Sequence, residues 1–203
     1  MTKILLTRHG HVEGIHPDRF RGRAELALTE QGLAEAAALA RRIARTWQPA
    51  MVYTSALQRC LTTGGFIAKA CAIEAVALDG LMDIDYGGRQ MRSHAEVEAE
   101  APHAYRIWMT APQWVRFPAG ESLQDLVART GDVLRLMLER HAQDCVVLVG
   151  HDSVNRAILM QLLDQPLSAY WRLAQSPCAL NEIDIAGGKV TVQRVNDTSH
   201  LSE

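Results

Sequence analysis

The feature that most constrains the fold is a recurring buried-strand pattern that alternates with helical patterns. The clearest example is Cys145–Val149 (CVVLV), a continuous apolar run that ends at Gly150. Lys3–Thr7 and Met51–Thr54 contain shorter apolar runs of the same kind. Strands that are apolar at nearly every position are buried on both faces, which is typical of parallel sheets covered by helices. We therefore predict an α/β fold, a three-layer α/β/α sandwich with a mostly parallel central sheet.

Helical patterns follow each of these strands, and the chain ends in a hairpin pattern. The predicted helices are 29–46 with Thr29 as N-cap, Ser55 (as N-cap) to about Ala70, Leu123–His141, and about Ser153–Leu163. The hairpin strands are Leu180–Ile185 and Val190–Val195, joined through Gly187 and Gly188. A chain of 203 residues can bury one good core, so we expect a single domain over 1–203.

Segment 79–121 breaks this order. It has poor periodicity and contains three of the seven prolines, together with Trp108 and Trp114. We expect an irregular excursion that covers one end of the sheet, with both tryptophans in the core.

Composition and charge exclude several classes of protein. Lys plus Arg number 21 against 23 Asp plus Glu, giving a net charge of −2, and no basic run occurs, which argues against a nucleic-acid partner. The apolar run at Ile4–Leu6 is too short for a signal peptide or a membrane span, so we expect a cytoplasmic protein with no membrane partner. The four cysteines form no CxxC pair and are predicted to be free thiols.

Charged side chains follow the ends of three predicted strands. Arg8 and His9 follow the first strand, Arg59 lies five residues after the second, and His151 follows the CVVLV strand. Because ligands gather at the carboxyl ends of parallel strands, these four side chains should converge. Guanidinium forks suit a tetrahedral oxyanion, and a neutral imidazole among them is a credible nucleophile toward phosphorus.

Five sequence blocks in order resemble the histidine phosphatase (phosphoglycerate mutase-like) superfamily. They are Thr7-Arg8-His9-Gly10, Arg19–Gly22 with Leu28–Gly32, Tyr53–Arg59 with Thr62-Thr63, Gly120-Glu121-Ser122, and Gly150-His151. The resemblance implies the sandwich fold and metal-independent catalysis through a phosphohistidine, with no cofactor. It is most similar to the phosphatase branch that includes α-ribazole and broad-specificity sugar phosphatases.

The resemblance also implies roles for individual residues. His9 matches the nucleophile, while Arg8, Arg59 and His151 match the phosphate pocket. Arg21, Gly22 and Tyr86 lie in matching blocks and are candidates for substrate contact. The excursion 79–121 would then cover the active site and supply the substrate-facing residues.

Two aspartates compete for the role of proton donor. The family places an acid in a block that here reads Leu81–Gly87, which puts Asp83 at the acid position. Asp152, directly after His151, matches the donor position of a more distant branch, although an N-cap role for it is the simpler interpretation. The family's usual phosphate-binding Asn is replaced by Ile15.

The sequence leaves alternatives to a phosphomonoesterase of small phosphorylated metabolites. Phosphoglycerate mutase-type transfer is one, although no basic insertion of the mutases lies between Asp83 and His151. A non-catalytic phospholigand binder is another. A metal site at His9, His11, His16 and Asp18 lacks a second ligand cluster, so we expect none. The expected partners are the small phosphorylated substrate and inorganic phosphate. The oligomeric state is open, with a homodimer as one option.

Overall fold

The computed structural model describes residues 1–202, in which a six-stranded sheet lies between two helical layers. The strand order is β3-β2-β4-β1-β5-β6. The strands are β1 (Thr2–Arg8), β2 (Met51–Thr54), β3 (Ala75–Ala77), β4 (Cys145–Gly150), β5 (Leu180–Ala186) and β6 (Lys189–Asp197). The first four are parallel, while β5 pairs antiparallel with β1 and β6 antiparallel with β5. The predicted sandwich with a mostly parallel sheet is confirmed.

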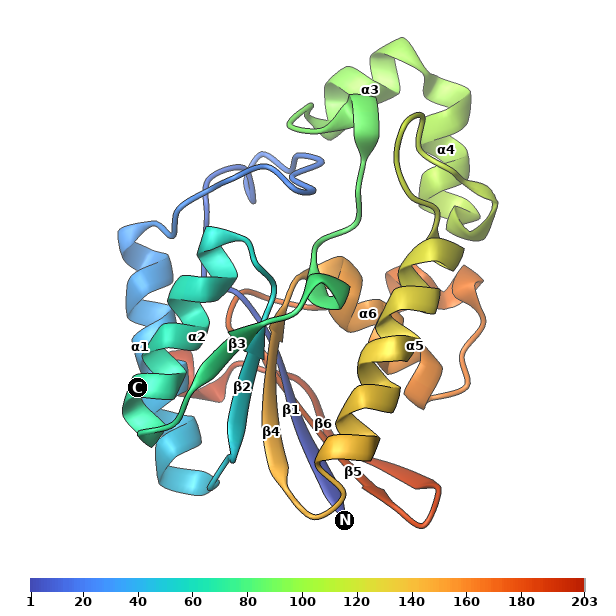
Figure 1. The fold of residues 1–203 in the computed structure, drawn as a ribbon. Helices are drawn as coiled ribbons and strands as arrows, with labels where there is room; N and C mark the ends of the chain where they lie inside the picture. Colours follow the sequence, from blue (N-terminus) through green and yellow to red (C-terminus); the bar gives the residue numbers. More distant parts are fainter. Residues whose placement is uncertain (203) are drawn as a thin grey trace.

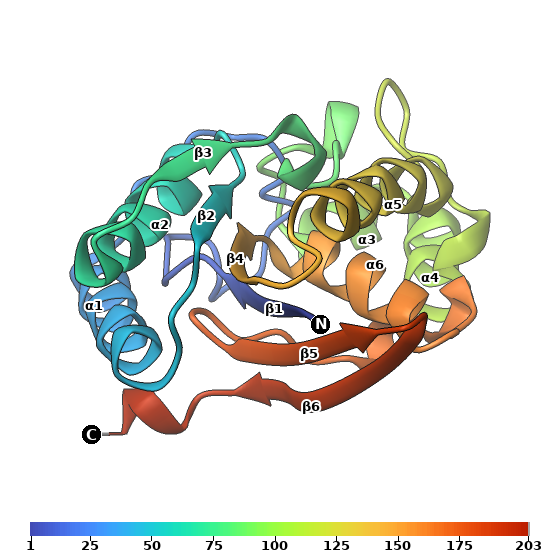
Figure 2. The ribbon, with the colours of Figure 1, turned by 60° about the horizontal axis from the view of Figure 1, so that its bottom comes forward.

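The helices cover both faces of the sheet. α1 (Glu30–Thr46) and α2 (Gln58–Cys71) pack on one face, and α5 (Leu123–Arg140) and α6 (Asp152–Leu162) on the other (Figures 1 and 2). Alternate strand residues serve the two layers: Leu5 and Val147 belong to the core beneath α1 and α2, whereas Leu6 and Leu148 belong to the core beneath α5 and α6. This explains why these strands are apolar at successive positions.

Several helix starts depend on local capping. The Thr29 side chain accepts a hydrogen bond from the Gly32 amide, as predicted for the N-cap of α1. Ser122 forms a capping box with Asp125 at the start of α5. The predicted Ser55 cap is wrong. α2 begins three residues later, and the Ser55 hydroxyl accepts instead from the Leu57 amide.

Segment 79–121 is more regular than predicted. It contains α3 (His94–Glu100), with a Ser93–Glu96 capping box, and α4 (Pro102–Thr110). Figure 1 shows both helices beyond the carboxyl ends of the parallel strands. Trp108 is buried as expected, but Trp114 is 78% exposed, so its predicted core position is wrong. It follows Pro112 in a short 3-10 turn at the surface.

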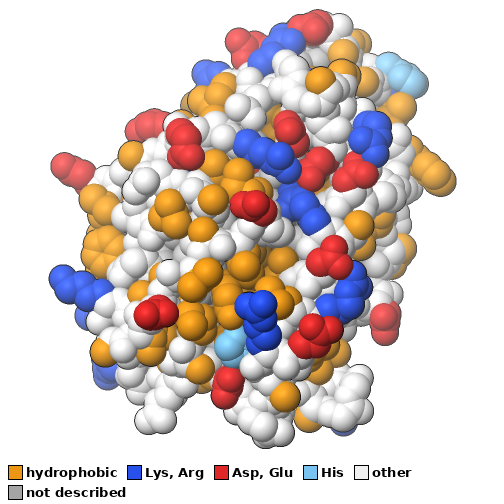
Figure 3. Space-filling model, in the orientation of Figure 1, with side chains coloured by type: hydrophobic (Ala, Val, Ile, Leu, Met, Phe, Trp, Pro, Cys, Tyr) orange, Lys and Arg blue, Asp and Glu red, His pale blue; other side chains and the backbone are white. Residues whose placement is uncertain are grey.

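The surface shows no segregation of charge on the face drawn in Figure 3, where acidic and basic side chains are interspersed. No helix within residues 1–202 combines the length and apolar character that a membrane span requires. All four cysteines are free.

Candidate active site

His9 directly follows β1 and is 1% exposed. Its Nδ1 lies 2.7 Å from the Gly10 carbonyl oxygen, which can only accept a hydrogen bond. The proton of the neutral ring is therefore on Nδ1, and the lone pair is on Nε2. Burial, followed by the charges of Arg59 and Arg8, holds the pKa of His9 well below its usual value. The ring is thus kept neutral with Nε2 available as a nucleophile.

Close packing fixes the loop that carries His9. A Cβ atom on Gly10 would lie 2.4 Å from the Gly32 carbonyl oxygen, so only glycine allows α1 to approach this closely. The Gly10 amide also donates to the Thr63 hydroxyl of α2 at 3.1 Å. The nucleophile is thereby held between two helices and the end of a strand.

Arg8, the last residue of β1, has unused hydrogen-bonding capacity in the interior. Its Nη1 donates to the Gln175 carbonyl at 2.7 Å, and the side chain is buried. Nε and Nη2 are also buried, and neither has a hydrogen-bond partner among residues 1–202. Burial lowers the pKa of Arg8, although the nearby Asp152 charge opposes the shift. Two buried donors without acceptors are costly unless an anion binds them, so Arg8 is suited to hold a phosphoryl group.

Arg59 and His151 contact each other beside His9. The His9 and His151 ring centroids are 5.2 Å apart. Arg59, fully buried in the first turn of α2, donates from Nε to His151 Nδ1 at 3.3 Å. His151 Nε2 therefore carries the ring proton and donates to the Ser55 hydroxyl at 2.9 Å. Burial and the charge of Arg59 hold the pKa of His151 well below its usual value, so this ring is also neutral in the free protein.

The other nitrogens of Arg59 are fixed by the loop before α1. Nη1 donates to the Ala24 carbonyl and Nη2 to the Gly22 carbonyl, each at 2.7 Å. Gly22 has a φ of +50°, a left-handed conformation that favours glycine. The motif residues Gly22 and Arg59 are therefore coupled through the backbone.

Asp83 is 3% exposed and faces the same cluster. Its Oδ2 lies 3.4 Å from Arg59 Nη2 and 3.7 Å from His151 Nδ1. Oδ1 accepts from the Ile84 amide at 2.9 Å and from the Ser153 hydroxyl. Burial, together with the negative charge of Asp152, raises the pKa of Asp83 above its usual value. This shift favours a carboxyl group that holds a proton.

Asp152 differs in both position and charge. It is the first residue of α6, whose N-cap is His151, so the N-cap interpretation of Asp152 is wrong. Its Oδ2 accepts from Arg156 Nη1 at 3.1 Å. Burial alone would raise the pKa of Asp152, but Arg8, Arg156 and Arg21 hold it far below the usual range. A carboxylate that stays ionised is a poor proton donor.

The three candidates for substrate contact lie near this cluster. Arg21 Nη1 donates to the Gly14 carbonyl and to Asp18 Oδ1, while its Nε and Nη2 have no partner within residues 1–202. Tyr86 packs its ring edge-on against Phe20 and Phe117, with centroids 5.0 and 4.9 Å away. Its ring is therefore part of the aromatic core that supports segment 79–121.

Sequence reasoning missed Arg129, which lies on α5. Arg129 Nη1 donates to the carbonyls of Gly80 and Met82, and Nη2 to the carbonyl of Asp83. Its Nε and Nη2 also bond the two carboxylate oxygens of Glu121. These bonds fix the backbone that presents Asp83. The one sequence signal that could have pointed to Arg129 was its partner Glu121, which lies in the Gly-Glu-Ser block.

The residues considered for a metal site, His9, His11, His16 and Asp18, do not form a ligand cluster in the described part of the chain. No group of three or more His, Cys, Asp or Glu side chains is placed to hold an ion there. His11 instead pairs its Nδ1 with the Thr29 hydroxyl at 2.9 Å. The His9 cluster itself combines two neutral imidazoles, two guanidiniums and a carboxyl group with a raised pKa, which suits attack on a phosphate ester.

Comparison with known proteins agrees with this chemistry. Residues 4–198 match the family model "Histidine phosphatase superfamily (branch 1)". Phosphoserine phosphatase 1 of Hydrogenobacter thermophilus is 30% identical over all of this chain and 96% of its own. The metal-independent phosphoserine phosphatase of Arabidopsis thaliana is 31% identical over all of this chain and 84% of its own. Among solved structures, Bacillus stearothermophilus YhfR superposes with a TM-score of 0.93 at 26% identity, covering 99% of this chain and 100% of its own.

Proposed function

Because this chain belongs to branch 1 of the histidine phosphatase superfamily, it hydrolyses phosphomonoesters through a phosphohistidine, and we propose that His9 forms that intermediate. The observation that carries the proposal is the buried arrangement around His9. Its ring holds a proton on Nδ1 and is influenced by the charge of Arg8, whose buried Nε and Nη2 have no hydrogen-bond partner within residues 1–202. Arg8, Arg59 and His151 would hold the phosphoryl oxygens. An incoming dianion would also raise the pKa of His151 and favour its charged form.

The first step transfers the phosphoryl group to the protein. The lone pair of His9 Nε2 attacks phosphorus, and the bond from phosphorus to the ester oxygen breaks. Asp83 gives its proton to the departing oxygen, so an alcohol leaves rather than an alkoxide. The raised pKa of Asp83 supports this role, and the ionised state of Asp152 argues against the alternative donor.

The second step returns the site to its starting state. Water gives a proton to the Asp83 carboxylate while its oxygen attacks phosphorus. The bond from phosphorus to Nε2 breaks, which releases inorganic phosphate and leaves His9 neutral.

We propose a phosphorylated amino acid, O-phosphoserine, as the first substrate to test. Two relatives that align over the whole chain are phosphoserine phosphatases. Arg21 supports the idea, because its free Nε and Nη2 can bind a substrate carboxylate. Gly22 and Tyr86 would shape the wall beside it. Arg21→Gln should lower kcat/KM for phosphoserine about tenfold more than for phosphoethanolamine, which lacks the carboxylate. Equal losses would contradict the carboxylate role.

Trapping the intermediate tests the mechanism. Rapid quench with labelled phosphoserine should give acid-labile phosphate on the wild-type protein and none on His9→Ala. Full activity of His9→Ala would refute the role of His9. Phosphoryl return to an acceptor rather than to water would identify a mutase, and tight binding without turnover would identify a phospholigand binder.

The cytoplasmic location and a homodimer remain predictions from the sequence. Light scattering coupled to size-exclusion chromatography measures the mass in solution. A mass of one chain, 22.4 kDa, would contradict the homodimer.

A further inference from the structure

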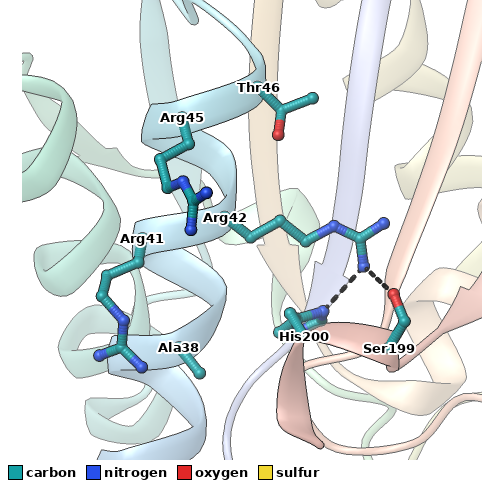
Figure 4. A pocket seen from close by; sticks show the side chains of 7 residues that line it. All are labelled: Ala38, Arg41, Arg42, Arg45, Thr46, Ser199 and His200. Atoms are coloured by element: carbon teal, nitrogen blue, oxygen red, sulfur yellow. Dashed lines mark hydrogen bonds between the residues drawn. The ribbon is translucent and has the colours of Figure 1, made fainter. Parts of the chain in front are cut away.

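A cavity of about 380 Å³ lies between the C-terminal half of α1 and the turn Ser199–Leu201 near the end of the chain (Figure 4). It is lined by Ala38, Arg41, Arg42, Arg45, Thr46, Ser199 and His200. Its size is within the range of small-molecule sites. Two segments more than 150 residues apart in sequence therefore enclose a space with three guanidiniums.

One of the three arginines is fixed and the other two are free to bind. Arg42 donates from Nη2 to Asp197 Oδ2 at 2.5 Å and from Nη1 to the Ser199 hydroxyl at 3.0 Å. Arg41 and Arg45 form no hydrogen bond or ion pair with any residue of the described chain 1–202. In Figure 4 both side chains extend from α1 without a partner.

The cavity is positively charged, whereas the protein as a whole has a negative net charge. The protein has a net charge of −2, yet three guanidiniums line this cavity, and within residues 1–202 the carboxylate of Asp197 is the only one that pairs with any of them. Arg41 and Arg45 are four residues apart on one helix face, where like charges repel each other. Favourable interaction with the α1 dipole explains basic residues in its last turn. It does not explain why the Ser199–Leu201 turn forms a second wall opposite these arginines.

We propose that this cavity binds a small polyanion with two phosphoryl groups. Each free guanidinium can bond two oxygens of one phosphoryl group, and Arg42 adds a third cation held in place by Asp197. The hydroxyl groups of Thr46 and Ser199 offer further donors. A ligand with one negative charge would leave one of the two free guanidiniums without a counter-charge.

The cavity is distinct from the His9 site. Glu30 and Arg45 are the near and far ends of α1 relative to His9, and fifteen residues at about 1.5 Å each separate them by roughly 22 Å. The near end of α1 contacts the catalytic loop through Gly32 and Gly10. The proposed ligand is thus an effector or a second ligand rather than part of the substrate.

Calorimetric titration with inorganic pyrophosphate at low ionic strength tests the proposal. We expect the Arg41→Gln/Arg45→Gln double variant to bind at least tenfold more weakly than the wild-type protein. The matched control, Arg135→Gln/Arg140→Gln, removes two exposed arginines from the end of α5 and should bind normally. Pyrophosphate bound at the His9 site is measured separately, as competitive inhibition of p-nitrophenyl phosphate hydrolysis.

The outcomes separate the cavity from the catalytic site. The inhibition constant should be the same in all three proteins, because Arg41 and Arg45 lie far from His9. Equal calorimetric affinity of the wild-type protein and the Arg41/Arg45 variant would overturn the proposal. Equally weakened pyrophosphate binding in the control variant would also overturn it, because that result indicates non-specific attraction. A wild-type titration that detects only the His9 site, as measured by inhibition, would overturn it too.

Discussion

Replacing Asp83 with asparagine tests whether Asp83 is the proton donor in the His9 site. Asparagine has nearly the same shape, and its carbonyl oxygen can keep the hydrogen bonds from the Ile84 amide and the Ser153 hydroxyl. The amide group has no proton to give to a leaving oxygen. The 3.4 Å contact from Asp83 Oδ2 to Arg59 Nη2 is long, so its loss should disturb the phosphate pocket little.

The expected effect depends on the leaving group. A positioned general acid contributes about 10²–10⁴-fold, or roughly 3–5 kcal/mol of transition-state stabilisation. For an alkyl ester such as phosphoserine, kcat/KM of Asp83→Asn should fall by that factor. For p-nitrophenyl phosphate, whose leaving group needs little protonation, it should fall by less than about tenfold.

Asp152→Asn is the matched control, because it removes an ionised carboxylate beside the same site. It should lower kcat/KM similarly for both esters. A loss in Asp83→Asn that is equal for both esters would refute the assignment of the proton donor. A leaving-group-dependent loss in Asp152→Asn would transfer the role to that residue.

The buried histidines, the Arg129 bonds and the end of α2 each give a further prediction. His9 and His151 are neutral when folded and titrate near pH 6.5 when unfolded, so the unfolded chain binds more protons as the pH falls. The free energy of unfolding, measured by urea denaturation, should therefore fall by about 3 kcal/mol between pH 7.5 and 5.5. Arg129→Ala should cost about 2 kcal/mol of stability and lower turnover of phosphoserine more than that of p-nitrophenyl phosphate, because Asp83 loses its support. Ala72 ends α2 with a φ of 55°, so Ala72→Gly should raise stability by about 0.5 kcal/mol.

Each of these predictions has a control. Stability that is flat between pH 7.5 and 5.5 would contradict the neutral buried rings. Arg135→Ala, at an exposed site on the same helix as Arg129, should leave stability and turnover nearly unchanged. Ala34→Gly, inside α1, should destabilise by about 1 kcal/mol, since its backbone is helical. A stability loss in Ala72→Gly would show that the left-handed conformation is not strained.

The parts of the fold that could be predicted from sequence are those where burial leaves a pattern. β4 is apolar at nearly every position because helices cover both faces of the sheet. β3 was missed because Ala75–Ala77 is a short, exposed edge strand with no apolar run. α3 was missed although Ser93 and Glu96 carry a readable capping-box signal, because the helix has only seven residues and buries only Val97. Short elements that depend on tertiary contacts leave little periodicity to detect.

For the active site, too, some features could be predicted from the sequence pattern and others required the contacts in the structure. The ends of parallel strands were sufficient to predict that Arg8, His9, Arg59 and His151 converge, because topology alone brings those positions together. Choosing between two candidate acids required their surroundings. Asp83 and Asp152 are the same residue type at the same site, but their pKa values move in opposite directions. Burial and the negative charge of Asp152 raise the pKa of Asp83, whereas the charges of Arg8, Arg156 and Arg21 lower that of Asp152.

Arg129 shows why some positioning residues cannot be read from a helical pattern. It occupies a polar position of α5, where an arginine normally faces solvent. Its structural role comes from hydrogen bonds to three backbone carbonyls of another segment. Backbone carbonyls have no sequence signature. Bonds from Arg129 to the main chain at 80–83 hold the segment from which the Asp83 side chain reaches the His9 cluster. Loosening those bonds should therefore affect proton donation before it affects phosphate binding.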